Sequence, residues 1–195
     1  QNYRISQFRS ESTFVSKEQL VRIVQTSENN TGLAFTYNEP SIWYEYVYDT
    51  AKLLKETDPN KAVVLVTNGY INEEPLRKLL PYIDAMNIDL KSFSNDFYKH
   101  LCGGKLEPVL KTIEIATRFC HVEITTLIVS GKNDQLEEIE KIAVYLKNIN
   151  PRIPLHLTRY FPRYRFDALP TDIRFMTKAK EVAKKHLSNV VLGNL

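Results

Sequence analysis

The segment Gly32-Leu-Ala-Phe-Thr-Tyr-Asn-Glu-Pro40 decides the fold of this 195-residue chain. A short apolar run leads into a polar tip, and the proline that follows is typical of the first turn of a helix. Polar tips also follow or end the next apolar runs, at Thr67-Asn68-Gly69 and at Asp89-Leu90-Lys91. Repeated units of strand, tip and helix predict a parallel sheet whose strands end together at one mouth, where the site is built.

The alternation continues along the whole chain. Apolar or β-branched runs between turn residues predict strands at 33–37, 62–66, 85–90, 122–129, 155–158 and 190–192. Helical periodicity predicts helices from Ser16 up to the Asn29-Asn30 break, and at 40–55, 73–80, 96–101, 108–119, 134–146 and 171–186. No linker or charge block interrupts residues 1–195, so we expect one domain. Because a closed barrel needs about 250 residues, the expected fold class is α/β, a partial (β/α) barrel of parallel strands with outer helices.

Composition excludes several classes of protein. With 43% hydrophobic and 25% charged residues, the chain is expected to be globular, without a membrane span or a signal peptide. The net charge of +3 comes from scattered basic residues, so nucleic acid is not an expected partner. Two cysteines, Cys102 and Cys120, have no paired metal spacing and favour a reducing cytoplasm over a disulfide scaffold.

Together these segments carry a resemblance to a known family. Asn2, the TYNEP, TNG and DLK tips and the stretch EITTLIVSGKND at 123–134 occur in the order and spacing of radical SAM enzymes. The chain resembles the pyruvate formate-lyase activating type, and most of all the AmmeMemoRadiSam-system branch. No single motif is specific, but the match runs from Gln1 to Asn194.

The resemblance implies a [4Fe-4S] cluster that is held by three cysteines in a CxxxCxxC loop followed by Gln-Asn. Since this chain begins at Gln1-Asn2, we expect a fragment that lacks the first strand and the cluster loop of a radical SAM core. Cluster ligation requires cysteine thiolates close together, and Cys102 and Cys120 cannot replace them by spacing. We therefore assign no metal ligand and no catalytic residue within the chain.

The resemblance also implies a wall for S-adenosylmethionine at the strand tips. Asn38 and Glu39 would accept hydrogen bonds from the methionyl ammonium, although the same pair could simply begin a helix. Thr67 and Asn68 would contact the methionyl or ribose part, or form a plain Asn-Gly turn.

Asp89 and Lys91 share one face by strand alternation. Lys91 would bind the ligand carboxylate and Asp89 an ammonium or ribose hydroxyl, and the alternative is a simple ion pair. Glu123 is expected to point into the partial barrel, where a carboxylate needs a partner. We expect Lys91 to be that partner. His156 is expected to be either a ligand contact or a core histidine.

One basic and aromatic cluster remains, and it would meet a substrate protein or the adenine, or lie in a solvated loop. Its members are Arg159, Tyr160, Phe161, Arg163, Tyr164 and Arg165.

The implied function is radical chemistry. The intact enzyme would cleave S-adenosylmethionine reductively to a 5′-deoxyadenosyl radical and abstract hydrogen, with a glycyl radical enzyme such as pyruvate formate-lyase as partner and a reduced flavodoxin or ferredoxin as electron donor. The alternatives are a barrel lyase or aldolase that uses Lys91 as a Schiff-base nucleophile, and a non-catalytic binding module. The 33–37 strand would have an uncovered edge, and we expect either residues 1–8 to fold back across it or a second copy of the chain to pair with it.

Overall fold

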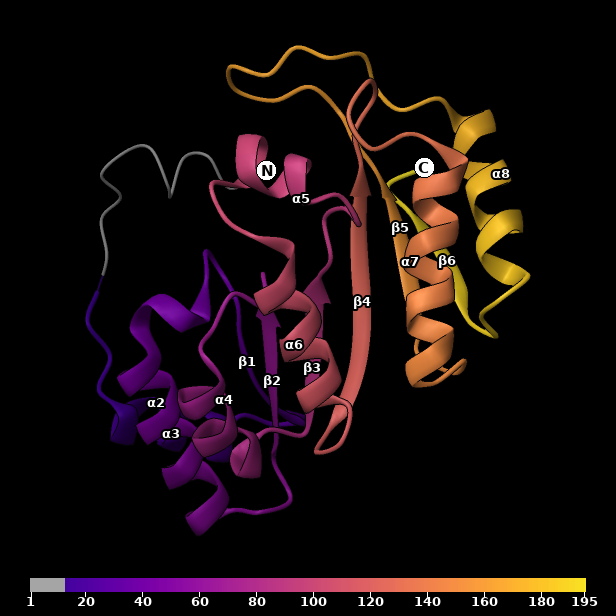
Figure 1. The fold of residues 1–195 in the computed structure, drawn as a ribbon. Coiled ribbons are helices and arrows are strands. Elements are labelled where there is room, and N and C mark those ends of the chain that lie inside the picture. The colour runs from indigo at the N-terminus through magenta and orange to yellow at the C-terminus, as the bar shows by residue number, and fades with distance from the viewer. Residues whose placement is uncertain (1–12) are drawn as a thin grey trace.

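The structure, a computed structural model, describes residues 13–195, and its strands form one parallel sheet (Figure 1). The strand order equals the chain order, so that each strand pairs with the next one along the sequence. The strands are β1 (Gly32–Phe35), β2 (Ala62–Thr67), β3 (Ala85–Asp89), β4 (His121–Ile128), β5 (Leu155–Arg159) and β6 (Val190–Gly193).

Helices connect the strands and lie on one side of the sheet (Figure 1). They are α2 (Lys17–Thr26), α3 (Tyr44–Thr57), α4 (Glu73–Leu79), α5 (Asn95–Phe97), α6 (Leu106–Ala116), α7 (Leu136–Ile149) and α8 (Ile173–Lys184). Shorter turns are the 3-10 segments η1 (Pro40–Trp43) and η2 (Leu80–Tyr82) and the π-helical segment η3 (Tyr98–Cys102). The expected fold class, a partial barrel of parallel strands with outer helices, is confirmed.

Strand alternation divides the sheet into two faces. On β4, Val122, Ile124, Thr126 and Ile128 are buried, while the alternate residues are half-buried or exposed. The buried face continues on β2, β3 and β5 and packs against the helices, which gives the core. The opposite face, which we call the open face, carries polar side chains on β3, β4 and β5, such as Asn87, Glu123 and His156, whereas its β2 residues are alanine and valine.

Local details correct the expected helix boundaries. The capping box at Ser16 and Gln19 is confirmed, with both reciprocal hydrogen bonds present. Pro40 begins a 3-10 turn that precedes the α-helix, and the Glu39 side chain caps this turn by accepting the amide of Ser41 at 3.1 Å. Asp134 does not cap α7, as its carboxylate accepts the amide of Gly131 at 2.9 Å.

Two further features concern the edge of the sheet and the apolarity of the helices. Among residues 13–195, β1 pairs only with β2, which leaves one side of its backbone at the sheet edge. Over the same residues, no helix combines the length and apolarity needed to cross a membrane.

Candidate ligand-binding site at the strand tips

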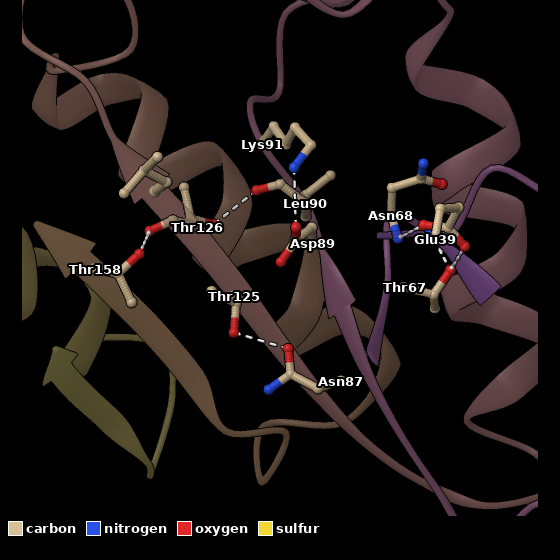
Figure 2. Close-up of polar contacts among 12 residues, drawn as sticks. Glu39, Thr67, Asn68, Asn87, Asp89, Leu90, Lys91, Thr125, Thr126 and Thr158 are labelled. Atoms are coloured by element: carbon tan, nitrogen blue, oxygen red, sulfur yellow. Dashed lines mark hydrogen bonds and ion pairs between the residues drawn. The ribbon is translucent and has the colours of Figure 1, made fainter. Parts of the chain in front are cut away.

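The carboxyl ends of β1, β2 and β3 bring five of the expected site residues together. Figure 2 shows Glu39, Thr67 and Asn68 on one side of this region and the Asp89–Lys91 pair on the other. These residues lie close together because the strands are parallel and in register, with Phe35 opposite Leu65 and Thr67 opposite Ile88.

Glu39 is the anchor that joins the tips of β1 and β2. Its carboxylate accepts the Thr67 hydroxyl at 2.6 Å and the Asn68 amide at 2.7 Å, in addition to the Ser41 amide. The side chain is buried, with 7% of its surface exposed. A buried carboxylate is stable only when such donors satisfy it. Glu39 therefore shapes the mouth, and with three donors on four acceptor positions it retains room for one more.

Asn38 precedes Glu39 in an exposed position, after a cis peptide bond between Tyr37 and Asn38. Asn68 continues the mouth on the β2 side. Its Oδ1 atom accepts the Tyr70 amide at 2.7 Å, which leaves the Nδ2 atom without a partner in the described part of the chain. Gly69 follows with a φ of 71°, and an added Cβ would lie 2.8 Å from the Ile88 side chain. The turn after β2 thus fixes Asn68 at the rim.

The Asp89 and Lys91 side chains meet, as alternation predicted. Lys91 Nζ donates to Asp89 Oδ2 at 2.9 Å, and both side chains are a little over one-third exposed. One ammonium can donate three hydrogen bonds, so that Lys91 keeps donors for a ligand carboxylate.

The backbone around Lys91 is held from two further elements. The Lys91 amide donates to the Tyr98 hydroxyl of η3 at 3.1 Å, and burial raises the pKa of Tyr98. Asn133, which follows β4, donates from Nδ2 to the carbonyl oxygens of Lys91 and Leu127 at 2.7 and 2.9 Å. Its Oδ1 accepts the Val129 amide at 2.7 Å. Asn133 therefore ties the tip of β3 to the tip of β4.

A buried carboxylate secures the residues after Lys91. Glu138 of α7 accepts the Ser92 hydroxyl and, at 2.5 Å, the Phe93 amide. Neither Asn133 nor Glu138 was predicted as part of the site. Asn133 lies within the SGKND stretch that carried the resemblance, but the sequence alone did not indicate which carbonyls it would hold.

A hollow of about 430 Å³ lies between these tips. Glu39, Asn68 and Lys91 line it together, with Tyr98 and Gly104 beyond them. A second hollow of about 220 Å³ adjoins it at Lys91 and is mainly apolar. Its lining includes Phe97, Leu101, Leu127, Val129 and Phe166. A charged compartment thus lies beside an apolar one, and Lys91 belongs to both.

Glu123 and His156 lie apart from the mouth, on the open face and nearer the amino ends of their strands. The expected Glu123–Lys91 pair is wrong. Glu123 instead contacts the imidazole Nε2 atoms of His121 at 3.0 Å and His156 at 2.7 Å. These hydrogen bonds hold the pKa of Glu123 below its usual value, against the desolvation that would raise it.

Asn87 is a further polar residue on the open face that was not predicted as part of the site. It lies two residues before Asp89 on the same face of β3, and Thr125 of β4 donates to its Oδ1 atom at 2.8 Å (Figure 2). The alternation that paired Asp89 with Lys91 extends to residue 87 and could have indicated it.

The described residues do not fit an iron–sulfur cluster. Cys102 lines the hollows at the strand tips, whereas Cys120 lines hollows with His121 near the amino ends of the strands. Burial raises the pKa of both thiols, that of Cys120 to about 12, so neither is a ready thiolate. Within residues 13–195, no three His, Cys, Asp or Glu side chains form a group that could hold a metal ion.

Comparison with known proteins defines the class. Residues 1–146 match the Radical SAM superfamily, which is three-quarters of the chain, and the chain belongs to this superfamily.

Two relatives with known sequences match most or all of this chain. The protein MJ0808 of Methanocaldococcus jannaschii is 38% identical over the whole of this chain, which covers 59% of that protein. The pyruvate formate-lyase-activating enzyme of Clostridium pasteurianum is 29% identical over 76% of the chain and 65% of the enzyme. The chain thus spans about three-fifths of the length of these two relatives.

A solved structure supports the fold. A domain of a pyruvate-formate lyase-activating enzyme from Bacteroides vulgatus superposes with a TM-score of 0.70 at 19% identity, covering 84% of this chain and 99% of that domain. At this identity the likeness concerns the fold.

Proposed function

We propose that the strand tips bind S-adenosylmethionine and that the complete protein is a radical SAM oxidoreductase of the glycyl-radical-activating type. The observation that carries this proposal is the hollow of about 430 Å³ that Glu39, Asn68 and Lys91 line together in a chain of this superfamily. The ligand has an ammonium, a carboxylate and an aromatic adenine ring, and the mouth offers an acceptor, one cationic donor and an adjoining hollow that is mainly apolar.

Each residue has a defined part in binding. Lys91 donates to the ligand carboxylate, while Asp89 holds the lysine side chain at the mouth through their ion pair and accepts from a ribose hydroxyl or the ammonium. Glu39 uses its remaining acceptor position for the ammonium, and Asn68 adds a donor from Nδ2. Asn38 and Thr67 border this position, Asn38 from the rim and Thr67 through its bond to Glu39.

The residues at the strand tips would orient the bound S-adenosylmethionine and exclude water, and the cofactor would supply a 5′-deoxyadenosyl radical on reductive cleavage. Because the described residues do not fit the cluster, we assign its three cysteines to sequence outside them and derive no step through it. On the open face, Glu123 and His156 lie farther from the tips. We propose that Glu123 and His156 form hydrogen bonds with a segment of the substrate that binds on the open face.

Relatives support the partner class. The Clostridium pasteurianum relative is a pyruvate formate-lyase-activating enzyme, and a Clostridium scatologenes relative, 24% identical over 73% of the chain, is a 4-hydroxyphenylacetate decarboxylase activating enzyme. We therefore propose a glycyl radical enzyme as the substrate protein, a flavodoxin or ferredoxin as electron donor, and the cytoplasm as the compartment.

The test uses the complete gene product, including any sequence that precedes Gln1. After anaerobic reconstitution with iron and sulfide and reduction with dithionite, we expect methionine and 5′-deoxyadenosine in equal amounts. With a pyruvate formate-lyase-type protein added, a glycyl radical signal should appear in the electron paramagnetic resonance spectrum. Absence of 5′-deoxyadenosine from a protein that carries a full cluster would refute the proposal.

The Lys91 aldolase alternative has less support. A Schiff-base nucleophile needs a nitrogen that is free to attack a carbonyl, and Lys91 Nζ is held in an ion pair with Asp89 at 2.9 Å. Borohydride trapping of a carbonyl substrate on Lys91 would restore this alternative.

A further inference from the structure

The segment between β5 and α8 carries a set of side chains that the proposed ligand site does not use. It passes above the carboxyl ends of the strands (Figure 1). We call residues 159–167 the arginine loop. It contains three arginines against one aspartate, together with four aromatic residues, Tyr160, Phe161, Tyr164 and Phe166.

The base of the arginine loop is firmly held. Thr171 donates its hydroxyl to the Ile128 carbonyl at 2.5 Å and accepts Arg159 Nε at its own carbonyl at 2.7 Å. The buried Tyr160 ring packs edge-on against Phe166, and its hydroxyl donates to the Phe166 carbonyl at 2.8 Å. A loop ordered in this way loses little conformational entropy when it binds a partner.

The tip presents its side chains outward. Arg163 and Phe166 close a tight turn, with Tyr164 in the left-handed region at a φ of 56°. Such a backbone conformation is unusual for a bulky residue, and strained residues of this kind cluster at sites that contact ligands or switch conformation. Phe161, Tyr164 and Phe166 are each about 40–50% exposed.

Two of the guanidinium groups lie on the aromatic rings. Arg159 Cζ is 4.6 Å from the centre of the Phe161 ring, and Arg165 Cζ is 5.1 Å from that of Tyr164. Stacked guanidinium groups keep their edges available for paired hydrogen bonds to a carboxylate. A guanidinium group therefore occupies one face of the Phe161 ring and one face of the Tyr164 ring, which leaves a single face of each ring for stacking with a nucleic-acid base.

We propose that the arginine loop is a docking surface for an acidic segment of a partner protein. Arginine and tyrosine are the residues that contribute most to protein–protein affinity, and the loop places both beside the mouth, since Phe166 also lines the apolar hollow at Lys91. The identity of the partner as the protein on which the enzyme acts rests on the proposed function, whereas the docking itself does not.

The test measures binding of a fluorescein-labelled dodecapeptide of alternating Glu and Gly by fluorescence anisotropy, with the 195-residue chain and no cofactor. A Gln-Gly dodecapeptide and a dT12 oligonucleotide are the comparison probes. The loop variant is Arg163→Gln with Arg165→Gln. The control, Arg174→Gln with Lys178→Gln, removes the same charge from exposed positions on α8.

We expect the Glu peptide to bind at low salt and the loop variant to weaken it about tenfold or more, the change that 1.4 kcal/mol produces. The control variant should change affinity less than twofold, and the Gln peptide should bind far more weakly. Equal losses in both variants, equal binding of the two peptides, or no binding would overturn the proposal. Tighter binding of dT12 than of the Glu peptide would reassign the loop to nucleic acid.

Because the assay contains no S-adenosylmethionine, its failure leaves the proposed radical chemistry untouched. Conversely, absence of cleavage activity in the complete protein would leave the docking result standing. All four substituted side chains are exposed, so we expect both variants to fold. Far-UV circular dichroism checks this.

Discussion

Lys91 is the residue on which the ligand proposal depends most directly, because it borders both hollows. In the complete protein, Lys91→Ala should weaken S-adenosylmethionine binding about tenfold to a hundredfold, as a hydrogen bond to a charged group contributes roughly 1.5–3 kcal/mol. Lys91→Gln should lose most of this too, since it keeps a donor without the charge. Isothermal titration calorimetry measures the affinity.

Lys99→Ala is the matched control, because Lys99 is exposed on the nearby η3. It should bind the ligand as the parent protein does. Unchanged affinity in both Lys91 variants would reduce the Asp89–Lys91 pair to a surface ion pair.

Glu123 gives a pH-dependent test on the open face. Its pKa is lowered in the folded state by hydrogen bonds from His121 and His156. A depressed carboxyl pKa adds stability above its unfolded value, near 4.5, and this is lost as pH falls through the folded value. Glu123→Gln should therefore lower the melting temperature more at about pH 6 than at about pH 3.5.

The effect should be small, about 1 kcal/mol or less, because solvent screens a side chain that is one-third exposed. That corresponds to about 2–4 °C by differential scanning calorimetry. Glu107→Gln, at an exposed position on α6, is the control. A deficit of equal size at both pH values would mean that ionisation of Glu123 is not involved.

At the scale of elements, Asn133 is the link between two strand tips. It is 1% exposed and holds the carbonyls of Lys91 and Leu127 and the Val129 amide. Asn133→Ala leaves these groups unpaired, which should lower the free energy of unfolding by about 2–4 kcal/mol. Asn133→Asp should be no better, because it replaces two donors with an acceptor.

Urea unfolding followed by circular dichroism measures both variants, and Asn148→Ala at an exposed site on α7 should leave the midpoint unchanged. If Asn133→Ala unfolds at the parent midpoint, the link between the tips contributes no stability.

The elements also show what a sequence reveals about such a protein. Local signals were sufficient for the strands and for the Asp89–Lys91 pair, because alternation within one strand fixes the face of each side chain. The predicted partner of Glu123 was wrong. Alternation could have indicated His121, which lies two residues earlier on the same strand, but His156 depends on the register between β4 and β5, which places it opposite Thr125 and beside Glu123. Asn133 was missed for the same reason, since its contacts join loops far apart in sequence.

For the whole molecule, the edge of β1 is the feature with a testable consequence. In the described structure, Leu33, Ala34 and Phe35 pair with β2 on one side, and the edge carries no charged side chain. Unprotected edges promote association. We expect the 195-residue chain to form a concentration-dependent dimer in sedimentation velocity, and Ala34→Lys to shift it toward monomer.

Val191→Lys places the same charge on β6, the opposite edge, and should leave the dimer intact. A monomer at high concentration, or equal effects of the two lysines, would show that β1 does not mediate association.

The order of the strands matters for how this protein is made. Each strand of the described sheet pairs with the strand that precedes it in the sequence. During translation, a strand and helix leaving the ribosome can therefore dock on a unit that has already emerged, without waiting for a distant segment. The sheet can grow from one edge as synthesis proceeds, and the tips of β3 and β4 are locked together only when Asn133 appears.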